Sequence, residues 1–364
     1  MNDLMDDLDT PVVLVDHGRM LSNIARMHEQ LCARGVVVRP HVKTHKIPQI
    51  ARLQRDAGAR GITVATIGEA EVFADHGFDD IFIAYPLWIT ARAAVRLRAI
   101  SARAKVMFGV DSAEGIAAAA AHLASAARDV SVMIEVDSGH HRSGVRPADV
   151  GSIASAARSR GLDVAGVFTF PGHSYAPGHA EEAARQEREA LAEAARSLAD
   201  AGWVDVWISG GSTPSVLATP AGAVSELRPG VYVFGDAQQV ELGHHALDEV
   251  ALTVLSTVVS RSEDGDQRRV ILDAGSKILG SDRPAYVSGF GRILEHPAAR
   301  IAALSEHHAT VVFPDDVALP ELGSRLRVIP NHVCLVPNLV DEVVVVRDGA
   351  VGERWPVAAR GRNG

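Results

Sequence analysis

The chain has 364 residues, of which 47% are hydrophobic and 22% charged, and its formal net charge is -9. This acidic balance argues against a nucleic-acid-binding protein, which needs a basic face, and no apolar run is long enough to span a membrane. Two cysteines, Cys32 and Cys334, are too few for a disulfide framework, and the acidic segment 1–9 lacks the features of a signal peptide. We therefore predict a cytoplasmic protein, long enough for two domains, whose partner is a small molecule.

Short apolar strands alternate with helices over most of the chain. A first strand is predicted at residues 10–16, and eight more begin at residues 36, 61, 81, 106, 130, 164, 206 and about 230, with helical segments between them. This alternation is typical of parallel βα units, and eight such units are what a closed (β/α)8 barrel requires. A doubly wound open sheet is the alternative, but no Gly-x-Gly-x-x-Gly motif follows an early strand.

The pattern changes after about residue 245. Strand-like segments separated by Gly, Pro and Asp turns follow, with little helix between them, at residues 250–260, 269–273, 310–313, 326–329 and 341–347. We therefore predict two domains. The first is a (β/α)8 barrel over residues 10–244, and the second is a mostly β domain over residues 245–358, which residues 1–12 are candidates to join.

The most informative segment is 36–46, which runs from β-branched residues into two lysines and two histidines. If Val38 faces the covering helices, strand alternation places His41 and Lys43 together on the opposite face. A partly desolvated lysine among other cations loses its proton more readily and can then act as a Schiff-base nucleophile. The alternative is a pair of solvated lysines after an edge strand, and the spacing alone leaves both interpretations open.

Polar residues follow several other predicted strands, at the end of a barrel where active sites form. Segment 210–215, Gly-Gly-Ser-Thr-Pro-Ser, has the glycines and hydroxyls of a phosphate-binding loop, with the backbone near Gly230 as its second half. A turn that caps a helix is the alternative. Segment 137–144 carries Arg142, whose guanidinium can hold an oxyanion, unless this segment is simply a solvated loop.

A histidine and a cysteine stand two residues apart near the end of the predicted β domain, in His332-Val333-Cys334. An imidazole and a thiolate suit zinc or a related divalent metal, with substrate or water in the remaining positions. The alternative is a buried cysteine beside an unrelated histidine. Two protein ligands are fewer than a structural zinc site has, so a bound metal would indicate a catalytic site.

Four motifs together resemble the D-threonine aldolase and D-serine dehydratase family, and they are Arg39-Pro40-His41-Val42-Lys43-Thr44-His45-Lys46, Gly210-Gly211-Ser212-Thr213-Pro214-Ser215, Arg228-Pro229-Gly230 and Asn331-His332-Val333-Cys334. The resemblance covers about residues 10 to 347. These are metal-activated pyridoxal phosphate (PLP) enzymes. The resemblance therefore implies a PLP-binding (β/α)8 barrel of the alanine-racemase-like fold (fold type III), a mostly β second domain, and a homodimer.

The resemblance also implies roles for individual residues. Lys43 would carry PLP as a Schiff base, and Arg142 would lie near the phenolic oxygen of the cofactor. The other implied cofactor-binding residues are Tyr175, Gly211, Ser212, Thr213, Gly230 and Tyr232, and the implied ligands of a Zn2+, Mn2+ or Mg2+ ion are His332 and Cys334. Arg228 resembles the arginine that faces the pyridine nitrogen in alanine racemases, and the sequence leaves the direction of its side chain open.

The implied substrate is a β-hydroxy-D-amino acid, and we expect a D-threonine aldolase, which forms glycine and an aldehyde. The expected catalytic residues are Lys43, Tyr175 and His173, with His173 as the base for the β-hydroxyl, unless it only orients Tyr175. A D-serine dehydratase that forms pyruvate and ammonia is the main alternative. A racemase of the same fold is a further one, and it would need a tyrosine from the β domain, where Tyr286 is the sole candidate.

Overall fold

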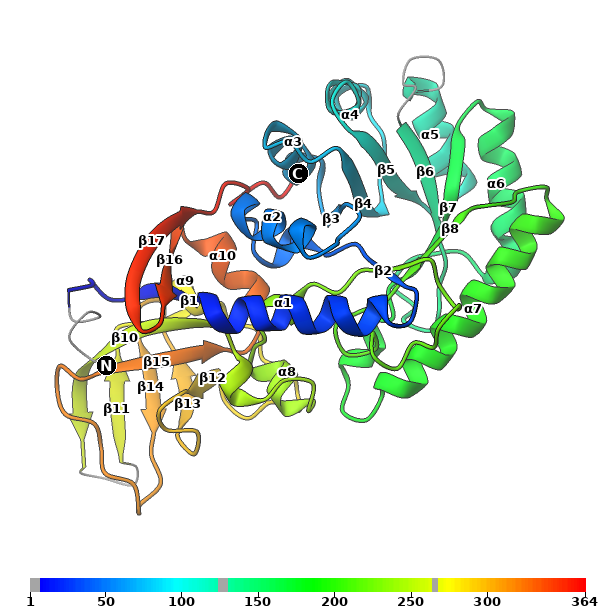
Figure 1. Ribbon diagram of the computed structural model, residues 1–364. Coiled ribbons are helices and arrows are strands. Elements are labelled where there is room, and N and C mark those ends of the chain that lie inside the picture. The colour runs from blue at the N-terminus through cyan, green and yellow to red at the C-terminus, as the bar shows by residue number, and fades with distance from the viewer. Residues whose placement is uncertain (1–6, 124–129, 264–267) are drawn as a thin grey trace. The chain divides into compact units, whose positions relative to one another are not determined.

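The computed structural model describes residues 7–123, 130–263 and 268–364, and its chain divides into two compact units (Figure 1). The barrel unit comprises Arg26–Lys43, Ile50–Gly230 and Arg362–Gly364, and the β unit comprises Met1–Ala25, Thr44–Gln49 and Val231–Gly361. The helical segment predicted between the strands that begin at residues 106 and 130 lies partly outside the described residues, as does the acidic segment 1–9. The predicted domain bounds, residues 10–244 and 245–358, stay a prediction.

The barrel unit contains a curled sheet of eight parallel strands, in the order β2-β9-β8-β7-β6-β5-β4-β3. Its strands are β2 (Val37–Val38), β3 (Ile62–Val64), β4 (Asp80–Pro86), β5 (Lys105–Val110), β6 (Val130–Glu135), β7 (Asp163–Phe168), β8 (Trp207–Gly210) and β9 (Glu226–Leu227). The helices between them are α2 (Pro48–Asp56), α3 (Ile67–Asp75), α4 (Ala91–Ser101), α5 (Ala113–Leu123), α6 (Val150–Ser159) and α7 (Ala180–Asp200). The predicted alternation of strands and helices is confirmed.

Strands β2 and β3 are the two outer strands of this sheet. A single parallel bridge joins His41, which follows β2, to Thr63 within β3. Large apolar side chains fill its interior, where Phe82 and Phe168 meet edge to face at 5.0 Å and pack with Met107 and Met133. Burial of such aromatic and thioether side chains is the main stabilising contribution to a core of this kind. The interior is therefore packed, and functional groups are confined to the loops at the strand ends.

Two predicted strands differ in the structure. The strand predicted from residue 36 to Lys43 ends at Val38, and Lys43 lies in a 3-10 turn, η1 (Val42–Thr44). Strand alternation is therefore the wrong reason for the direction of the Lys43 side chain. The eighth strand of the barrel is Glu226–Leu227, whereas the prediction placed it near residue 230. The chain near residue 230 instead enters the 3-10 turn η4 (Val231–Val233). Proline explains both differences, since Pro40 and Pro229 cannot donate to a sheet ladder.

The β unit is built around a nine-stranded sheet that includes the first strand of the chain. Its strands are β1 (Val12–Asp16), β10 (Leu252–Ser262), β11 (Arg269–Leu272), β12 (Gly291–Ile293), β13 (Arg300–Leu304), β14 (Ala309–Val312), β15 (Arg325–Pro330), β16 (Glu342–Arg347) and β17 (Ala350–Pro356). Strand β1 pairs with β10 in antiparallel and with β16 in parallel orientation. The predicted mostly β character of this region is confirmed.

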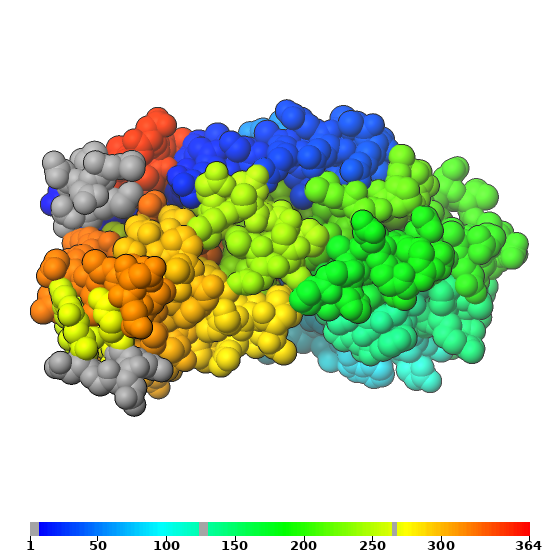
Figure 2. Space-filling view, turned by 90° about the horizontal axis from the view of Figure 1, so that it is seen from below, coloured from blue at the N-terminus to red at the C-terminus, as the bar shows by residue number. Residues whose placement is uncertain are grey.

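The remaining helices are α1 (His17–Cys32), α8 (Ala237–Glu241), α9 (Ser276–Leu279) and α10 (Val336–Leu339), with short 3-10 turns η2 (Pro147–Asp149), η3 (Gly172–Tyr175), η5 (Leu247–Glu249) and η6 (Val333–Leu335). Within the described ranges, every helix is too short or too polar to cross a membrane. The longest, α7, presents one side to solvent (green in Figure 2) and buries the other.

Candidate active site

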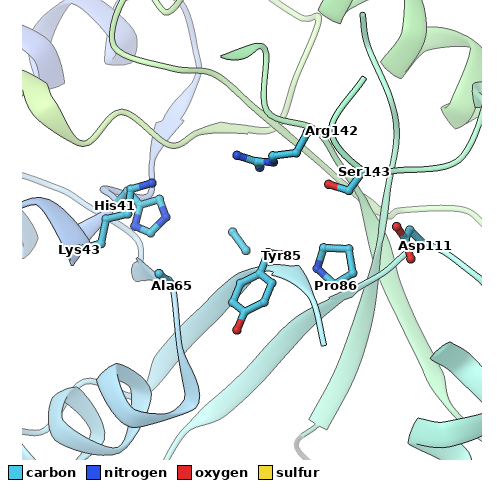
Figure 3. Close-up of a pocket in the computed structure, with 9 residues that line it drawn as sticks. His41, Lys43, Ala65, Tyr85, Pro86, Asp111, Arg142 and Ser143 are labelled. Carbon is cyan, nitrogen blue, oxygen red and sulfur yellow. The ribbon is translucent and has the colours of Figure 1, made fainter. Parts of the chain in front are cut away.

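The loops at the carboxyl ends of the parallel strands line a cavity of about 440 Å3 in the barrel unit (Figure 3). Lys43 and Arg142 approach this cavity from opposite sides. Each of the other polar lining residues follows or ends a different strand of the sheet, and they are His41, Tyr85, Asp111 and Ser143. Side chains from separate strands therefore converge on one space, as expected for the functional end of a barrel.

Phe170, which follows β7, is the centre around which the charged groups are arranged. The Lys43 Nζ atom lies 5.9 Å from the centroid of its ring, and the Arg142 guanidinium lies 5.2 Å from it. The same ring contacts His140 edge to face at 5.9 Å and Tyr175 at 6.4 Å. An aromatic face attracts cations, so Phe170 holds two positive groups near each other despite their mutual repulsion.

His173 and Tyr175 both belong to the turn η3. The two ring nitrogens of His173 are buried and have no hydrogen-bond partner among the described residues. Its ring stacks on that of His140, with 6.3 Å between the centroids. Burial, with the nearby Arg142 and His173, lowers the pKa of His140. A histidine whose nitrogens are free of other bonds can accept or donate a proton in a bound ligand.

The segment predicted to bind phosphate is a buried hydroxyl-rich turn. Ser212 lies at its centre: its Oγ is 2.7 Å from Ser174 Oγ and 2.9 Å from Ser215 Oγ. Thr213, in the same turn, is also buried. The Gly211 amide donates to Glu187 Oε1 at 2.6 Å, so its proton is directed at a carboxyl group rather than at open space.

Glycine is required at position 211 for two reasons. Its backbone has a φ of +88°, and a Cβ there would lie 2.6 Å from the Leu227 Cδ2 atom. Gly230 ends the barrel unit, and Tyr232 lies in η4 of the β unit, where its carbonyl oxygen is 3.1 Å from His245 Nε2. Each of these predicted cofactor-binding residues is thus located, and their role in binding a phosphate stays a prediction.

Arg228 points into the barrel interior. Its guanidinium donates to Ser209 Oγ and to the Thr169 carbonyl oxygen, each at 2.5 Å, and lies 5.5 Å from the ring centroids of both Phe82 and Phe168. Burial lowers the pKa of Arg228 to about 10. Arg228 is absent from the described residues that line the cavity, so its donors serve the barrel core.

The proposed metal ligands lie directly after β15 in the β unit, where His332 precedes the turn η6 and Cys334 lies within it. Cys334 Sγ is 3.3 Å from Thr44 Oγ1, and His332 Nδ1 is 3.7 Å from Asp236 Oδ2. Burial lowers the pKa of His332, but Cys334 and Asp236 outweigh this effect and raise the pKa to about 9. Negative charge therefore surrounds the imidazole, as a cation site requires.

In the parts of the chain that the structure describes, no group of three or more His, Cys, Asp or Glu side chains is arranged to hold a metal. His332 and Cys334 nevertheless supply the imidazole and thiolate donors that suit zinc. The Asp236 carboxylate near Nδ1 would leave Nε2 of His332 to face an ion, which is the usual arrangement of a metal-binding histidine. The residues present therefore fit a two-ligand site that substrate or water completes.

Sequence reasoning assigned no functional role to four residues of this region: Tyr85, which was noted only as a polar residue after a predicted strand, and Asp111, Phe170 and Glu187. Tyr85 and Asp111 have a readable signal, because each stands at or just after the end of an apolar strand. The sequence predicts Phe170 as the last residue of an apolar strand, but β7 ends two residues earlier, at Phe168. Glu187 lies in the middle of a helix that is far from the motifs in the sequence.

Comparison with known proteins matches residues 15–238 to the family model "Alanine racemase, N-terminal domain" and residues 251–346 to "Putative serine dehydratase domain". The chain is 36% identical to D-threo-3-hydroxyaspartate dehydratase of Delftia sp. over 92% of this chain and 93% of that protein. It is 33% identical to D-threonine aldolase of Arthrobacter sp. (97% and 93% covered) and 30% identical to D-serine dehydratase of Dictyostelium discoideum (95% and 95%).

The fold is likewise similar to a solved structure. The Delftia dehydratase superposes with a TM-score of 0.88 at 34% identity, over 98% of this chain and 99% of that chain. The predicted family and fold class are thereby confirmed. The chain belongs to the family of PLP-dependent D-amino-acid lyases that includes D-threonine aldolase and D-serine dehydratase, and it is an enzyme of that class with the alanine-racemase-like fold.

Proposed function

We propose that the chain is a PLP- and divalent-metal-dependent lyase that acts on β-hydroxy-D-amino acids, and that it cleaves D-threonine to glycine and acetaldehyde. The observation that carries this proposal is the pair of cations, Lys43 and Arg142, held over Phe170 at the edge of one cavity. A single amine beside a guanidinium suits a cofactor that has both an aldehyde and an adjacent oxyanion.

The residues present fit PLP. Lys43 supplies the amine and Arg142 the partner for the phenolic oxygen, while the buried Ser212 and Thr213 hydroxyls and the backbone around Gly230 suit a phosphate. The two ring nitrogens of His173, which have no hydrogen-bond partner among the described residues, support further hydrogen bonding to a ligand in this region. When bound, PLP withdraws electrons from the bonds at the α-carbon of an attached amino acid.

A divalent metal would be held by His332 and Cys334. A solved structure of a D-threo-3-hydroxyaspartate dehydratase carries a cysteine-to-alanine substitution and is described as the metal-free form, and another carries a histidine-to-alanine substitution two positions earlier. The same spacing separates His332 from Cys334 in this chain. Such an ion supplies Lewis-acid polarisation of a substrate oxygen.

Proton transfer falls to the chain's own side chains. For cleavage, a base must remove the proton of the β-hydroxyl, and we assign this role to a ring nitrogen of His173, since neither nitrogen has another partner among the described residues. For dehydration, a base must instead remove the α-proton, and the Lys43 amine is the candidate. Tyr175, whose ring lies near that of Phe170, would position the substrate or the cofactor between His173 and Lys43.

The experiment that tests this function is incubation of the protein, PLP and Mn2+ or Zn2+ with D-threonine, followed by assays for acetaldehyde and for 2-oxobutyrate. We expect acetaldehyde with an equal amount of glycine. Formation of 2-oxobutyrate and ammonia without acetaldehyde contradicts the aldolase proposal. The L-enantiomer serves as the control substrate.

A dehydratase is the second candidate, because the Delftia relative with 36% identity is named as one. D-serine and D-threo-3-hydroxyaspartate are therefore assayed in parallel for a 2-oxo acid. The racemase alternative is disfavoured by the chemistry of Tyr286, the base that the sequence predicts for it. Burial, together with Asp236, raises the pKa of Tyr286 to about 12, so its phenolate is scarce near neutral pH.

The homodimer implied by the resemblance is also part of this proposal, and light scattering of the purified protein tests it. The expected mass is about twice the 38.6 kDa of one chain. The cytoplasmic location stays a prediction from the sequence, and fractionation of the source cells tests it.

A further inference from the structure

A glutamate interrupts the buried side of α7. Besides Glu187, the buried residues of this helix are all apolar, and they are Ala183, Ala184, Leu191, Ala194 and Leu198. Glu187 is fully buried, with 0% of its surface exposed. Burying a carboxyl group among apolar residues is costly unless it makes a specific interaction, so its position calls for an explanation.

The Glu187 carboxyl group reaches the loop that follows β8. Its Oε1 atom accepts the backbone N–H of Gly211 at 2.6 Å. The preceding residue, Gly210, also lies against Glu187, because a Cβ at position 210 would lie 2.5 Å from the same oxygen. The helix side chain and the loop backbone are thus fitted to each other. The contact fixes the direction of the peptide between Gly210 and Gly211.

The rest of the loop is ordered by hydroxyl groups rather than by Glu187. Ser212 N–H donates to Ser215 Oγ at 3.2 Å, and Ser215 N–H to Ser212 Oγ at 3.3 Å. These bonds close a turn whose entry is set by the Gly211 amide. If that amide turned away from Glu187, the whole turn would start in a different direction.

We propose that Glu187 is a positioning residue that holds the loop of residues 210–215 in the shape required to bind the phosphate group of the cofactor. This inference rests on the proposed function, which places a phosphate at this loop. Glu187 does not itself contact the phosphate. It acts through the Gly211 peptide, so its effect is confined to ligands that carry a phosphate.

The charge state of Glu187 provides a readout that a purely structural role would not change. Burial raises the pKa of Glu187 to about 7, against the opposing effects of the Gly211 N–H, the Arg228 guanidinium and the Thr219 hydroxyl. The neutral acid accepts the Gly211 N–H without placing a negative charge behind the loop. Once ionised, the carboxylate repels a phosphate dianion. The chain should therefore bind phosphate less tightly as pH rises through about 7.

The experiment measures the Kd of PLP and of pyridoxal, which lacks the phosphate, for the full-length chain stripped of cofactor. The variants are Glu187→Gln, which keeps an acceptor but cannot ionise, and Glu187→Ala, which removes the acceptor. Glu193→Gln is the matched control, since Glu193 is on the exposed side of the same helix. Each Kd is measured from pH 6 to pH 8.5.

We expect Glu187→Ala to weaken PLP binding about tenfold, as expected for loss of a hydrogen bond that orders the loop, with pyridoxal unaffected. Glu187→Gln should match the wild type at pH 6 and bind PLP more tightly than it above pH 7. The control variant should match the wild type throughout. Equal weakening of PLP and pyridoxal, an unchanged Kd in Glu187→Ala, or a pH-independent ratio between Glu187→Gln and wild type each overturns the inference.

A failure of the proposed function gives a different result. If the wild-type chain binds neither PLP nor pyridoxal, the lyase proposal is wrong, and inorganic phosphate is then the probe. A phosphate-dependent rise in Tm that is present in the wild type and Glu187→Gln but lost in Glu187→Ala still supports the positioning role. An equal rise in all three proteins, or no rise in the wild type, overturns it.

Discussion

The two candidate sites of this chain are built in different ways. The cavity of the barrel unit collects side chains from the ends of several strands, including His41, Lys43, Asp111 and Arg142. The His332 and Cys334 pair comes from one turn after one strand. The first site depends on the whole curled sheet, and the second on a short local segment. A substitution in the turn that carries His332 and Cys334 should therefore remove metal binding without disturbing the cavity of the barrel unit.

The two sites also differ in charge. Two cations share the face of Phe170 in the cavity, whereas the imidazole of His332 lies near the Asp236 carboxylate and the Cys334 sulfur. A cationic cavity suits an anionic cofactor and an amino-acid carboxylate, and an electron-rich pair suits a divalent cation. The comparison predicts that cofactor binding and metal binding can be separated by mutation.

The largest separation is expected from Lys43→Ala. This variant should lose lyase activity to below detection, because no amine remains to attach the cofactor. It should still bind zinc as the wild type does, measured by metal content after dialysis. Lys105→Ala, at an exposed lysine that begins β5, is the control and should keep full activity. Residual lyase activity in Lys43→Ala after PLP is added would show that another residue attaches the cofactor.

Glu187 predicts a pH-dependent stability that belongs to the barrel unit alone. Its folded pKa of about 7 exceeds the ordinary 4.5, so between these values the folded state binds more proton than the unfolded state. The stabilisation is complete below pH 4.5 and is lost as pH rises through 7, by about 3 kcal/mol at most. Urea unfolding of the cofactor-free chain from pH 5 to pH 8 measures it.

The control for that prediction is Glu187→Gln, which cannot titrate. Its free energy of unfolding should fall less over this pH range than that of the wild type, whereas Glu193→Gln should follow the wild type. Parallel pH profiles for wild type and Glu187→Gln would show that Glu187 is already ionised in the folded state.

Cys334→Ala tests the other site. Removing one of two protein ligands should lower metal affinity by at least the roughly 10- to 100-fold that loss of an outer-shell partner costs, and lower activity accordingly, while the visible absorbance of bound PLP is retained. Cys32→Ala is a matched control, because Cys32 is the only other cysteine and is exposed. Normal turnover of the Cys334 variant without added metal would remove this pair from the mechanism.

The smallest effect is expected from Phe170→Leu. A leucine keeps the apolar volume but loses the attraction of the ring for Lys43 and Arg142, which is worth about 0.5–1 kcal/mol at a site open to solvent. PLP affinity should fall by a few fold. Phe78→Leu is the control, since Arg55 lies 5.5 Å from that ring in a place remote from the cavity-lining residues. Equal PLP affinity in both variants would show that the ring does not position the two cations.

The sequence indicated the fold through its long apolar runs. Strands β4, β5 and β6 are continuous apolar segments and were placed within a residue or two. Strands β12, β13 and β17 are not predicted from the sequence. Strand β12 has only three residues, and β17 carries Gly, Glu and Arg. Their stability comes from pairing with β15 and β16, which no local pattern reveals.

The site was predictable only where reactive polar side chains come shortly after the end of a strand. Lys43 and Arg142 were expected at strand ends, and the structure brings both to one cavity. The sequence predicts Phe170 only as the end of an apolar strand, because its contacts with Lys43, Arg142 and His140 depend on other segments. Glu187 has a local signal, an acid within an apolar helical stripe, but its partner Gly211 is 24 residues away and is found only in three dimensions.

The central claim is that the Lys43 amine holds PLP. The most direct measurement is borohydride reduction of the purified protein with PLP, followed by peptide mapping by mass spectrometry. The account predicts one stable pyridoxyl adduct, located on Lys43, and loss of activity in proportion to its yield. An adduct on another lysine alone, or no adduct at all, would contradict the account.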